Sequence, residues 1–137
     1  MAISLKLDSN GDFLHCKGSG QFALKDACSM FHDIFVTSAE RSASKVLVDC
    51  LEIGGNPTTV DRYEFAEFIA REVVGYINER KGFPKLAIVG KEPLVDPNRF
   101  GELVARNRGV AIKVVEQMEE ALEWLAVGQK LNPEDEP

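Results

Sequence analysis

Alternating apolar and polar residues at the start of the chain predict a hairpin of two strands. Residues 3–7 follow the two-residue period of a half-buried strand, with Ile, Leu and Leu at the alternate positions. The pair Asn10-Gly11 comes next, and both residue types tolerate the positive φ that a tight hairpin turn requires. We expect residues 13–17 to return as a second, antiparallel strand that ends at Gly18-Ser19-Gly20.

The next segment has a helical period. Apolar residues recur at steps of three and four at Leu24, Ala27, Cys28, Phe31, Ile34 and Phe35. Polar residues occupy the other positions, so the segment predicts an amphipathic helix that covers a core. The run Lys45-Val46-Leu47-Val48 predicts a strand that is buried on both faces. We expect a loop over residues 51–59, because Gly54-Gly55-Asn56-Pro57 favours neither a helix nor a strand.

A second helix is predicted to start at Thr58 or Thr59, whose hydroxyl groups can cap free backbone N–H groups. Lys81-Gly82, followed by Pro84, is a typical helix end. Residues 85–89, which are apolar after Lys85, then predict a fourth strand.

The last third of the chain predicts a helix, a strand and a final helix. Asp96-Pro97 supplies an N-cap and a proline at the first helical position, and this third helix is expected to end at Asn107-Arg108-Gly109. Residues 110–115 predict the fifth strand. A helix over residues 118–125 follows, with acidic residues near its N-terminus.

The predicted element order is ββαβαβαβα. Strands that are separated by one helix favour right-handed crossovers and parallel pairing, whereas the leading hairpin adds an antiparallel partner. The sequence therefore predicts an α/β fold with a mixed five-stranded sheet and four helices, in one domain over residues 1–127. Residues 128–137 have one leucine, one lysine and three acidic residues, which is typical of a disordered acidic tail.

Composition narrows the classes of function. The chain of 137 residues has a net charge of -6, which argues against a nucleic-acid partner because phosphate backbones need a basic surface. Its longest unbroken apolar run is residues 86–89, far below the ~20 residues of a membrane span, so no membrane insertion is expected. The chain has three cysteines, Cys16, Cys28 and Cys50, which is an odd number and includes no C-x-x-C pair. This pattern argues against a disulfide framework and favours a location in the reducing cytoplasm.

Several short motifs appear in the same order as the predicted elements. They are Gly18-Ser19-Gly20, Lys45-Val46-Leu47-Val48-Asp49, Asp61-Arg62-Tyr63-Glu64-Phe65-Ala66, Ala87-Ile88-Val89-Gly90, Ala105-Arg106-Asn107-Arg108-Gly109 and Glu119-Glu120-Ala121-Leu122-Glu123-Trp124-Leu125. With this order the chain resembles a small bacterial STAS-type domain, the group named for sulphate transporters and anti-sigma-factor antagonists. In particular it resembles the SpoIIAA-like branch that is also compared with lipid-binding SEC14 domains. The resemblance implies a non-enzymatic module for regulation or interaction.

The resemblance also implies a phosphorylation site at the start of the second helix. Anti-sigma-factor antagonists commonly have Asp-Ser-Ser/Ala-Gly there, whereas this chain has Asn56-Pro57-Thr58-Thr59-Val60-Asp61. Thr58 and Thr59 are the candidate phosphoacceptors, because a phosphate is favoured at a helix N-terminus. The alternative interpretation is that both residues are plain helix caps.

Ligands of open α/β sheets usually bind beyond the carboxyl ends of the parallel strands. The candidate ligand- or partner-binding residues at that edge are Asp49, Cys50, Glu52, Thr58, Asp61, Arg62, Gly90 and Lys91. We expect the loops after the third and fourth strands to bind a protein partner or a small ligand there. The alternative is a solvated edge with a few surface ion pairs, which contribute little to stability.

No constellation of residues indicates catalysis. A nucleophilic Cys50 would need a lowered pKa, and the neighbouring Asp49 and Glu52 oppose a thiolate. Cys28 and His32 stand four residues apart on a helix, but no further metal ligand accompanies them at a recognisable spacing. The glycine pairs lack the patterns of phosphate-binding loops. We therefore expect no catalytic residue, no metal and no cofactor, and predict that the chain is not an enzyme.

Aromatic residues crowd the second predicted helix at Tyr63, Phe65, Phe68 and Tyr76. They are typical of a helix that packs on a sheet, and they would also suit a homodimer interface. A third interpretation is an apolar pocket, which would make the chain a SEC14-like carrier of a lipid or another apolar small molecule.

Overall fold

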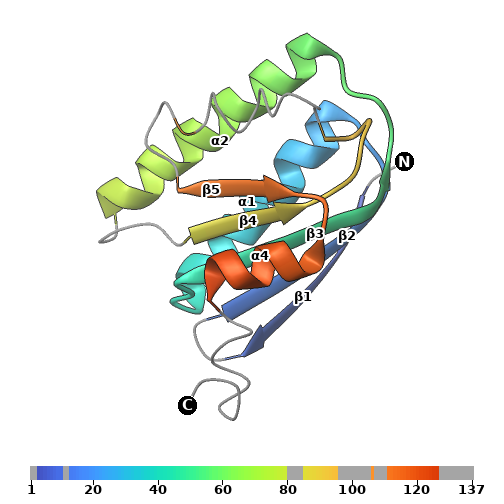
Figure 1. Ribbon diagram of the computed structural model, residues 1–137. Helices are drawn as coiled ribbons and strands as arrows, with labels where there is room; N and C mark the ends of the chain where they lie inside the picture. The colour runs from blue at the N-terminus through green and yellow to red at the C-terminus, as the bar shows by residue number, and fades with distance from the viewer. Residues whose placement is uncertain (1–2, 11–12, 80–84, 96–105, 107–110, 127–137) are drawn as a thin grey trace.

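A mixed five-stranded sheet forms the middle layer of the fold, with its strands in the order β1-β2-β3-β4-β5 (Figure 1). The computed structural model describes residues 3–10, 13–79, 85–95, 106 and 111–126. The strands are β1 (Ser4–Asn10), β2 (Phe13–Gln21), β3 (Lys45–Gly54), β4 (Lys85–Val89) and β5 (Ile112–Val115). β1 pairs with β2 in antiparallel orientation, and every other pair of neighbours is parallel. The predicted mixed sheet is confirmed.

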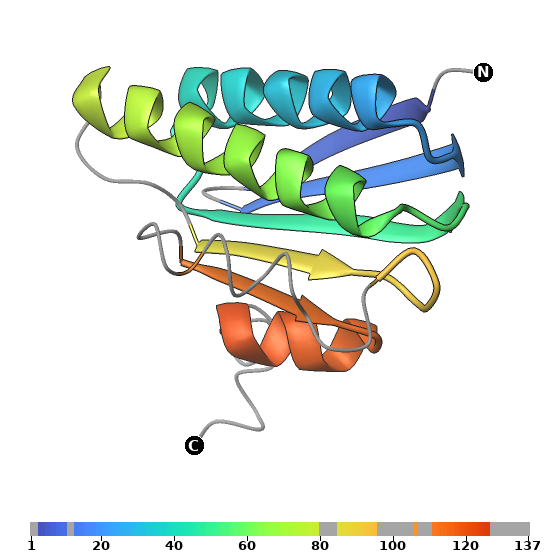
Figure 2. The same ribbon diagram turned by 90° about the horizontal axis from the view of Figure 1, so that it is seen from above.

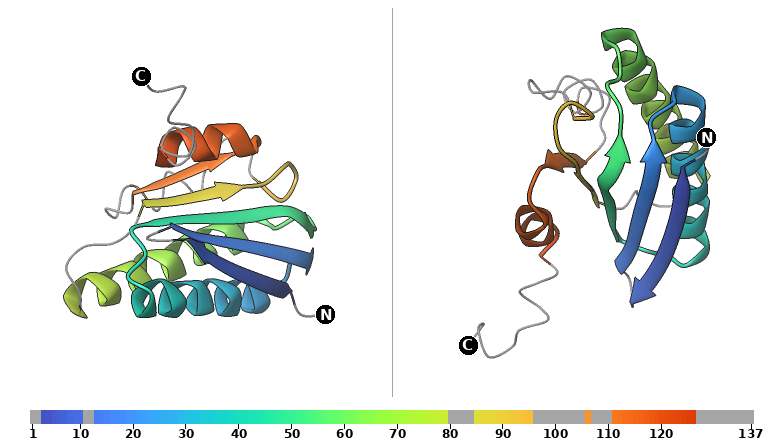
Figure 3. Two further views of the ribbon diagram at one scale, coloured as in Figure 1. Left: turned by 90° about the horizontal axis from the view of Figure 1, so that it is seen from below. Right: turned by 90° about the vertical axis from the view of Figure 1, so that its right-hand side faces the viewer.

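The described helices cover both faces of this sheet (Figures 2 and 3). α1 (Leu24–Glu40) and α2 (Thr59–Glu79) lie side by side on one face, and α4 (Met118–Leu125) lies on the other. The described residues therefore contain three helices, each of which the apolar period predicts. Four predicted features lie outside the described residues. They are the turn at Gly11, the helix end at residues 81–84, the third helix over 96–109 (of which only Arg106 is described) and the tail over 128–137.

The sequence predicts that β2 ends at Gly18-Ser19-Gly20, and this prediction is wrong. The strand continues to Gln21. The register against β3 shifts between Lys17 and Ser19, which accommodates an extra residue on the partner strand. Gly18 has a packing role at this point. A Cβ atom there would lie 3.0 Å from both Ile53 Cδ1 and Met30 Sδ, so the missing side chain allows the helix to approach the strand closely.

β3 is also longer than predicted and extends to Gly54 instead of ending at Val48. Its parallel pairing with β2 continues as far as the pair Gln21 and Gly54, and these partner hydrogen bonds extend the strand into a segment that its sequence marks as a loop. The candidates Asp49, Cys50 and Glu52 are therefore strand residues. The start of β5 at Ile112 lies two residues after the predicted one.

Two apolar clusters lie on the two faces of the sheet. On the α1–α2 face, Val46 and Val48 of β3 are completely buried beside Ile34 of α1. On the opposite face, Leu47 of β3 packs with Leu125 of α4. Because successive side chains of a strand point to opposite faces, β3 needs a covering layer on both sides. This confirms the prediction of a strand that is buried on both faces.

The orientation of α1 can be tested with two truncations on the same helix. Ile34 is 0% exposed and Val36 is 41% exposed. We expect Ile34→Ala to lower the free energy of unfolding by about 2–5 kcal/mol, because it leaves a cavity in the core. Val36→Ala should change it by less than about 1 kcal/mol. Urea denaturation of both variants measures the difference, and equal losses would contradict the orientation of the helix.

Candidate functional site

The first turn of α2 lies against the loop that follows β4, at the carboxyl ends of the parallel strands. We call this region, formed by the carboxyl ends of β3 and β4 and the first turn of α2, the carboxyl edge. The Arg62 guanidinium group on α2 donates a hydrogen bond through Nη2 to the backbone carbonyl of Pro93. The structure therefore brings together two of the segments that the sequence placed at one edge.

Thr58 is the N-cap of α2. Its Oγ1 accepts a hydrogen bond of 3.0 Å from the backbone N–H of Asp61, and its own N–H donates to Asp61 Oδ2 at 3.1 Å. This reciprocal pair satisfies two backbone donors at the helix start, as in a capping box. Thr59 is the first residue of the helix and is exposed. The capping interpretation is confirmed for Thr58.

Gly90 and Lys91 follow β4 and differ in their surroundings. Gly90 is buried, and its N–H donates a hydrogen bond of 2.9 Å to the carbonyl of Val115. A Cβ atom at Gly90 would lie only 2.8 Å from Val95 Cγ2 and 3.8 Å from Cys50 Cβ, so glycine permits the loop to fold back closely. Lys91 is exposed at the same edge.

Asp49 and Glu52 do not converge with Cys50. Asp49 is 7% exposed, and its Oδ1 accepts a hydrogen bond of 2.9 Å from the N–H of Leu51, where the register of the strand shifts. Glu52 forms an exposed ion pair with Lys17 of β2 at 3.1 Å, which contributes little to stability. Because Asp49 and Cys50 are neighbours in a strand, their side chains point to opposite faces of the sheet.

Burial controls the chemistry of the cysteine thiols. It raises the pKa of the Cys50 thiol from 9.0 to about 12, and the nearby Asp49 charge acts in the same direction. Burial likewise raises the pKa of Cys16 to about 12. A group with so high a pKa stays protonated near neutral pH, and the thiolate is the nucleophilic form. The surroundings of Cys50 therefore oppose its use as a nucleophile.

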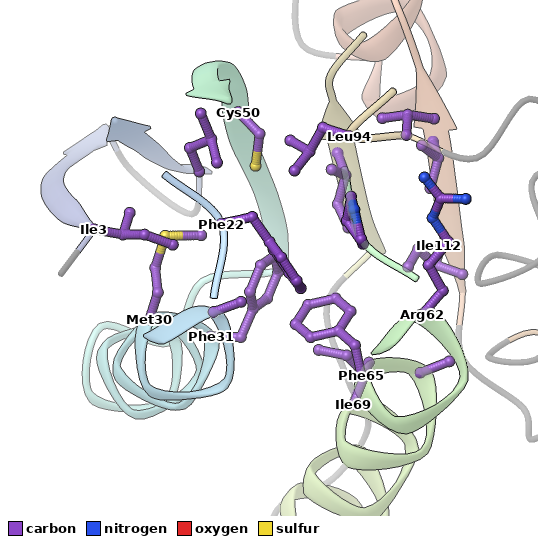
Figure 4. Close-up of a pocket in the computed structure, with 17 residues that line it drawn as sticks. Ile3, Phe22, Met30, Phe31, Cys50, Arg62, Phe65, Ile69, Leu94 and Ile112 are labelled. Carbon is purple, nitrogen blue, oxygen red and sulfur yellow. The ribbon is translucent and has the colours of Figure 1, made fainter. Parts of the chain in front are cut away.

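An apolar cavity of about 140 Å³ lies between α1, α2 and the sheet (Figure 4). Cys50 of β3 borders it from the sheet, and Phe31 of α1 and Phe65 of α2 face one another across the gap between the helices. Their rings meet edge to face, with centroids 5.1 Å apart. The sequence indicated an apolar pocket only through the aromatic residues of the second helix, and of these Phe65 lines the cavity.

The other aromatic residues of α2 have different places. Tyr63 is 44% exposed, and Phe68 lies in a shallow groove between α1 and α2 beside Cys28. Tyr63 and Val60, which is 62% exposed, form an apolar patch at the start of α2. The sequence pointed to Tyr63 as an aromatic residue of this helix but not to Val60. The available signal was that Val60 lies outside the helical period of the buried residues Ala66, Ile69 and Val73.

Cys28 and His32 do not belong to a metal centre in the part of the chain that the structure describes, where no cluster of three or more potential ligands occurs. The His32 ring instead contacts Glu72 of α2, with Nδ1 and Oε1 3.0 Å apart. Among the described helices, none has the length and apolar character needed to cross a membrane.

Comparison of the sequence with protein-family models and with curated proteins finds no match. Solved structures with a similar fold include an anti-sigma factor antagonist from Mycobacterium paratuberculosis, with a TM-score of 0.57 and 12% identity over 91% of this chain and 95% of that one. Another is an uncharacterised protein of the DUF3478 family with a SpoIIAA-like fold from Shewanella loihica. Its TM-score is 0.51, with 20% identity over 90% of this chain and 93% of that one. The chain therefore has the SpoIIAA-like fold, as the sequence resemblance implied.

The cap of α2 can be tested by comparing two adjacent threonines. We expect Thr58→Ala to lower the free energy of unfolding by about 1 kcal/mol, because the backbone N–H of Asp61 loses its acceptor. Thr59→Ala is the matched control and should change it by less than about 0.5 kcal/mol. Urea denaturation measures both values, and a larger loss for Thr59→Ala would contradict this assignment of the cap.

The raised thiol pKa values predict a fall in stability at alkaline pH. Between pH 9 and about pH 12 the thiols of the unfolded chain lose their protons, whereas Cys16 and Cys50 in the folded chain keep theirs. The folded state then binds more protons, so stability declines as pH rises through this window. The double variant Cys16→Ala/Cys50→Ala should show a shallower decline in urea denaturation between pH 8 and pH 10. Parallel declines for both proteins would contradict the prediction.

Proposed function

We propose that this chain is a non-enzymatic regulatory module that binds a protein partner through its carboxyl edge. Its fold is that of an anti-sigma factor antagonist, a protein whose name describes action on another protein. The buried and protonated Cys50 thiol supports a role in binding over a role in covalent catalysis. The described cysteines are free thiols, which suits a reducing cytoplasm.

The observation that carries this proposal is the exposed apolar patch of Val60 and Tyr63. The two residues stand three positions apart, so they share one side of the first helical turn. The exposed Lys91 belongs to the loop that Arg62 ties to the same turn. Protein interfaces commonly combine an apolar centre that includes tyrosine with a charged rim. A second copy of this chain is one partner that such a patch could bind.

Phosphorylation would change this surface if it occurs. A phosphate on Thr58 would disrupt the hydrogen bond from the Asp61 N–H and would lie beside the Asp61 carboxylate, so repulsion opposes it. Thr59 is exposed and takes no part in the cap, and it is the better candidate phosphoacceptor of the two. A phosphate there would add negative charge next to Val60.

The second candidate function is a carrier of an apolar molecule, and the cavity of about 140 Å³ favours it. Pockets for drug-sized ligands usually measure roughly 300–1,000 Å³. The cavity is smaller than that range, so a whole lipid would exceed it. A carrier with this cavity would hold a much smaller molecule than a SEC14 domain holds.

The proposed surface can be tested by comparing Val60→Lys with Val74→Lys on the same helix. Both valines are exposed, at 62% and 51%, so both variants should fold, and Val74 lies far along α2 from the first turn. Affinity capture from the native cell extract, quantified by mass spectrometry, should retain the same partner with the wild type and with Val74→Lys. We expect Val60→Lys to retain about tenfold less, because it places a charge in an apolar contact. Equal retention by all three proteins would exclude this patch.

A further inference from the structure

We propose that the cavity between α1, α2 and the sheet is a binding site for one small uncharged apolar molecule, of the size of a single aromatic ring or a short hydrocarbon chain. This inference rests on the proposed function: it adds a binding site for a small ligand next to the surface that is proposed to bind the protein partner. Ligand binding is a property of the chain alone, so it can fail while partner binding stands, and the reverse also holds.

The walls of the cavity determine the chemistry of the ligand. The sheet contributes aliphatic side chains, including Ile88 and Val114, and the two helices contribute Met30, Phe31 and Phe65 (Figure 4). Aromatic edges and a polarisable sulfur atom favour contact with a ring. A charged molecule would lose its hydration in this apolar space without compensating hydrogen bonds.

Arg62 is the charged residue among the described residues that line the cavity. Its guanidinium group donates to the backbone carbonyl of Pro93, so this hydrogen bond engages it at the carboxyl edge. The side chain thereby joins α2 to the loop after β4 beside the cavity. Arg62 is therefore assigned to the rim of the site, and the ligand is expected to lie deeper, beside the contacting rings of Phe31 and Phe65.

The volume sets the size of the ligand. Enclosed apolar cavities of roughly 150 Å³ bind benzene, and this pocket, which is partly open to solvent, has a similar volume of about 140 Å³. The walls of an empty cavity lack the dispersion contacts that a packed interior has. An apolar ring would restore those contacts, whereas a long acyl chain would have to force the helices apart.

The site and the partner surface share the first two turns of α2. Arg62 and Phe65 line the cavity, and Val60 and Tyr63 of the same two turns are exposed. A ligand that binds better when the start of α2 packs tightly on the sheet would stabilise this packed conformation. It would thereby also stabilise the exposed surface that Val60 and Tyr63 form in that conformation. The proposed ligand would in this way bias partner binding without touching the partner.

The experiment is a titration of the ¹⁵N-labelled full chain with benzene, followed by two-dimensional NMR. We expect saturable shifts of the backbone signals around the cavity, in α1, α2, β3 and β4. Ala66→Leu and Ala27→Leu enlarge two buried side chains in the cavity wall, one on each helix. Either variant that keeps the native unfolding transition should bind benzene at least about tenfold more weakly, because leucine occupies the space.

Val74→Leu on the exposed side of α2 is the matched control, and it should bind benzene as the wild type does. Benzoate tests the effect of charge by comparison with benzene, and dodecanoate tests the effect of size by comparison with benzoate, which carries the same charge; both should bind more weakly than benzene. The proposal is overturned if benzene causes no saturable shifts around the cavity, or if the folded leucine variants bind it unchanged. If benzoate binds more tightly than benzene, the assignment of an uncharged ligand is overturned. If dodecanoate binds more tightly than benzoate, the assignment of a small ligand is overturned.

Discussion

The parallel pairing of β3 with both of its neighbours is the constraint on which the rest of the structure depends. The central residues of a strand in that position have no solvent-exposed face, so Val46 and Val48 on one side and Leu47 on the other each need a covering layer. α1 and α2 supply the first layer and α4 supplies the second (Figure 3). Because β2 to β5 pair in parallel and run in the same direction, their carboxyl ends all lie at one edge.

At that edge, the start of α2 has one side that faces the sheet and another side that faces solvent. Phe65 and Arg62 line a cavity over the sheet, while Val60 and Tyr63 remain exposed. The cap formed by Thr58 and Asp61 sets where this turn begins, and the hydrogen bond from Arg62 to Pro93 ties it to the loop after β4. A ligand under the turn and a partner on its outer side would therefore act on the same structural unit.

The fold by itself does not determine the function. Similarity at 12% and 20% identity establishes the SpoIIAA-like architecture, and one architecture can support unrelated activities. Particular side chains support the proposed function. The raised pKa of Cys50 argues against its use as a nucleophile. The exposed patch of Val60 and Tyr63 favours binding of a protein partner, and the cavity beside Phe31 and Phe65 favours binding of a small apolar ligand.

The sequence by itself determined the features that depend on local patterns. The apolar run at residues 86–89 matches β4, the helical period matches α1 and α2, and the threonine pair marks the start of α2. Only the tertiary structure decided where β2 and β3 end, because their mutual pairing carries β2 past Gly18 and Gly20 to Gln21 and carries β3 as far as Gly54. It also created the cavity, since a cavity depends on which faces of distant segments meet.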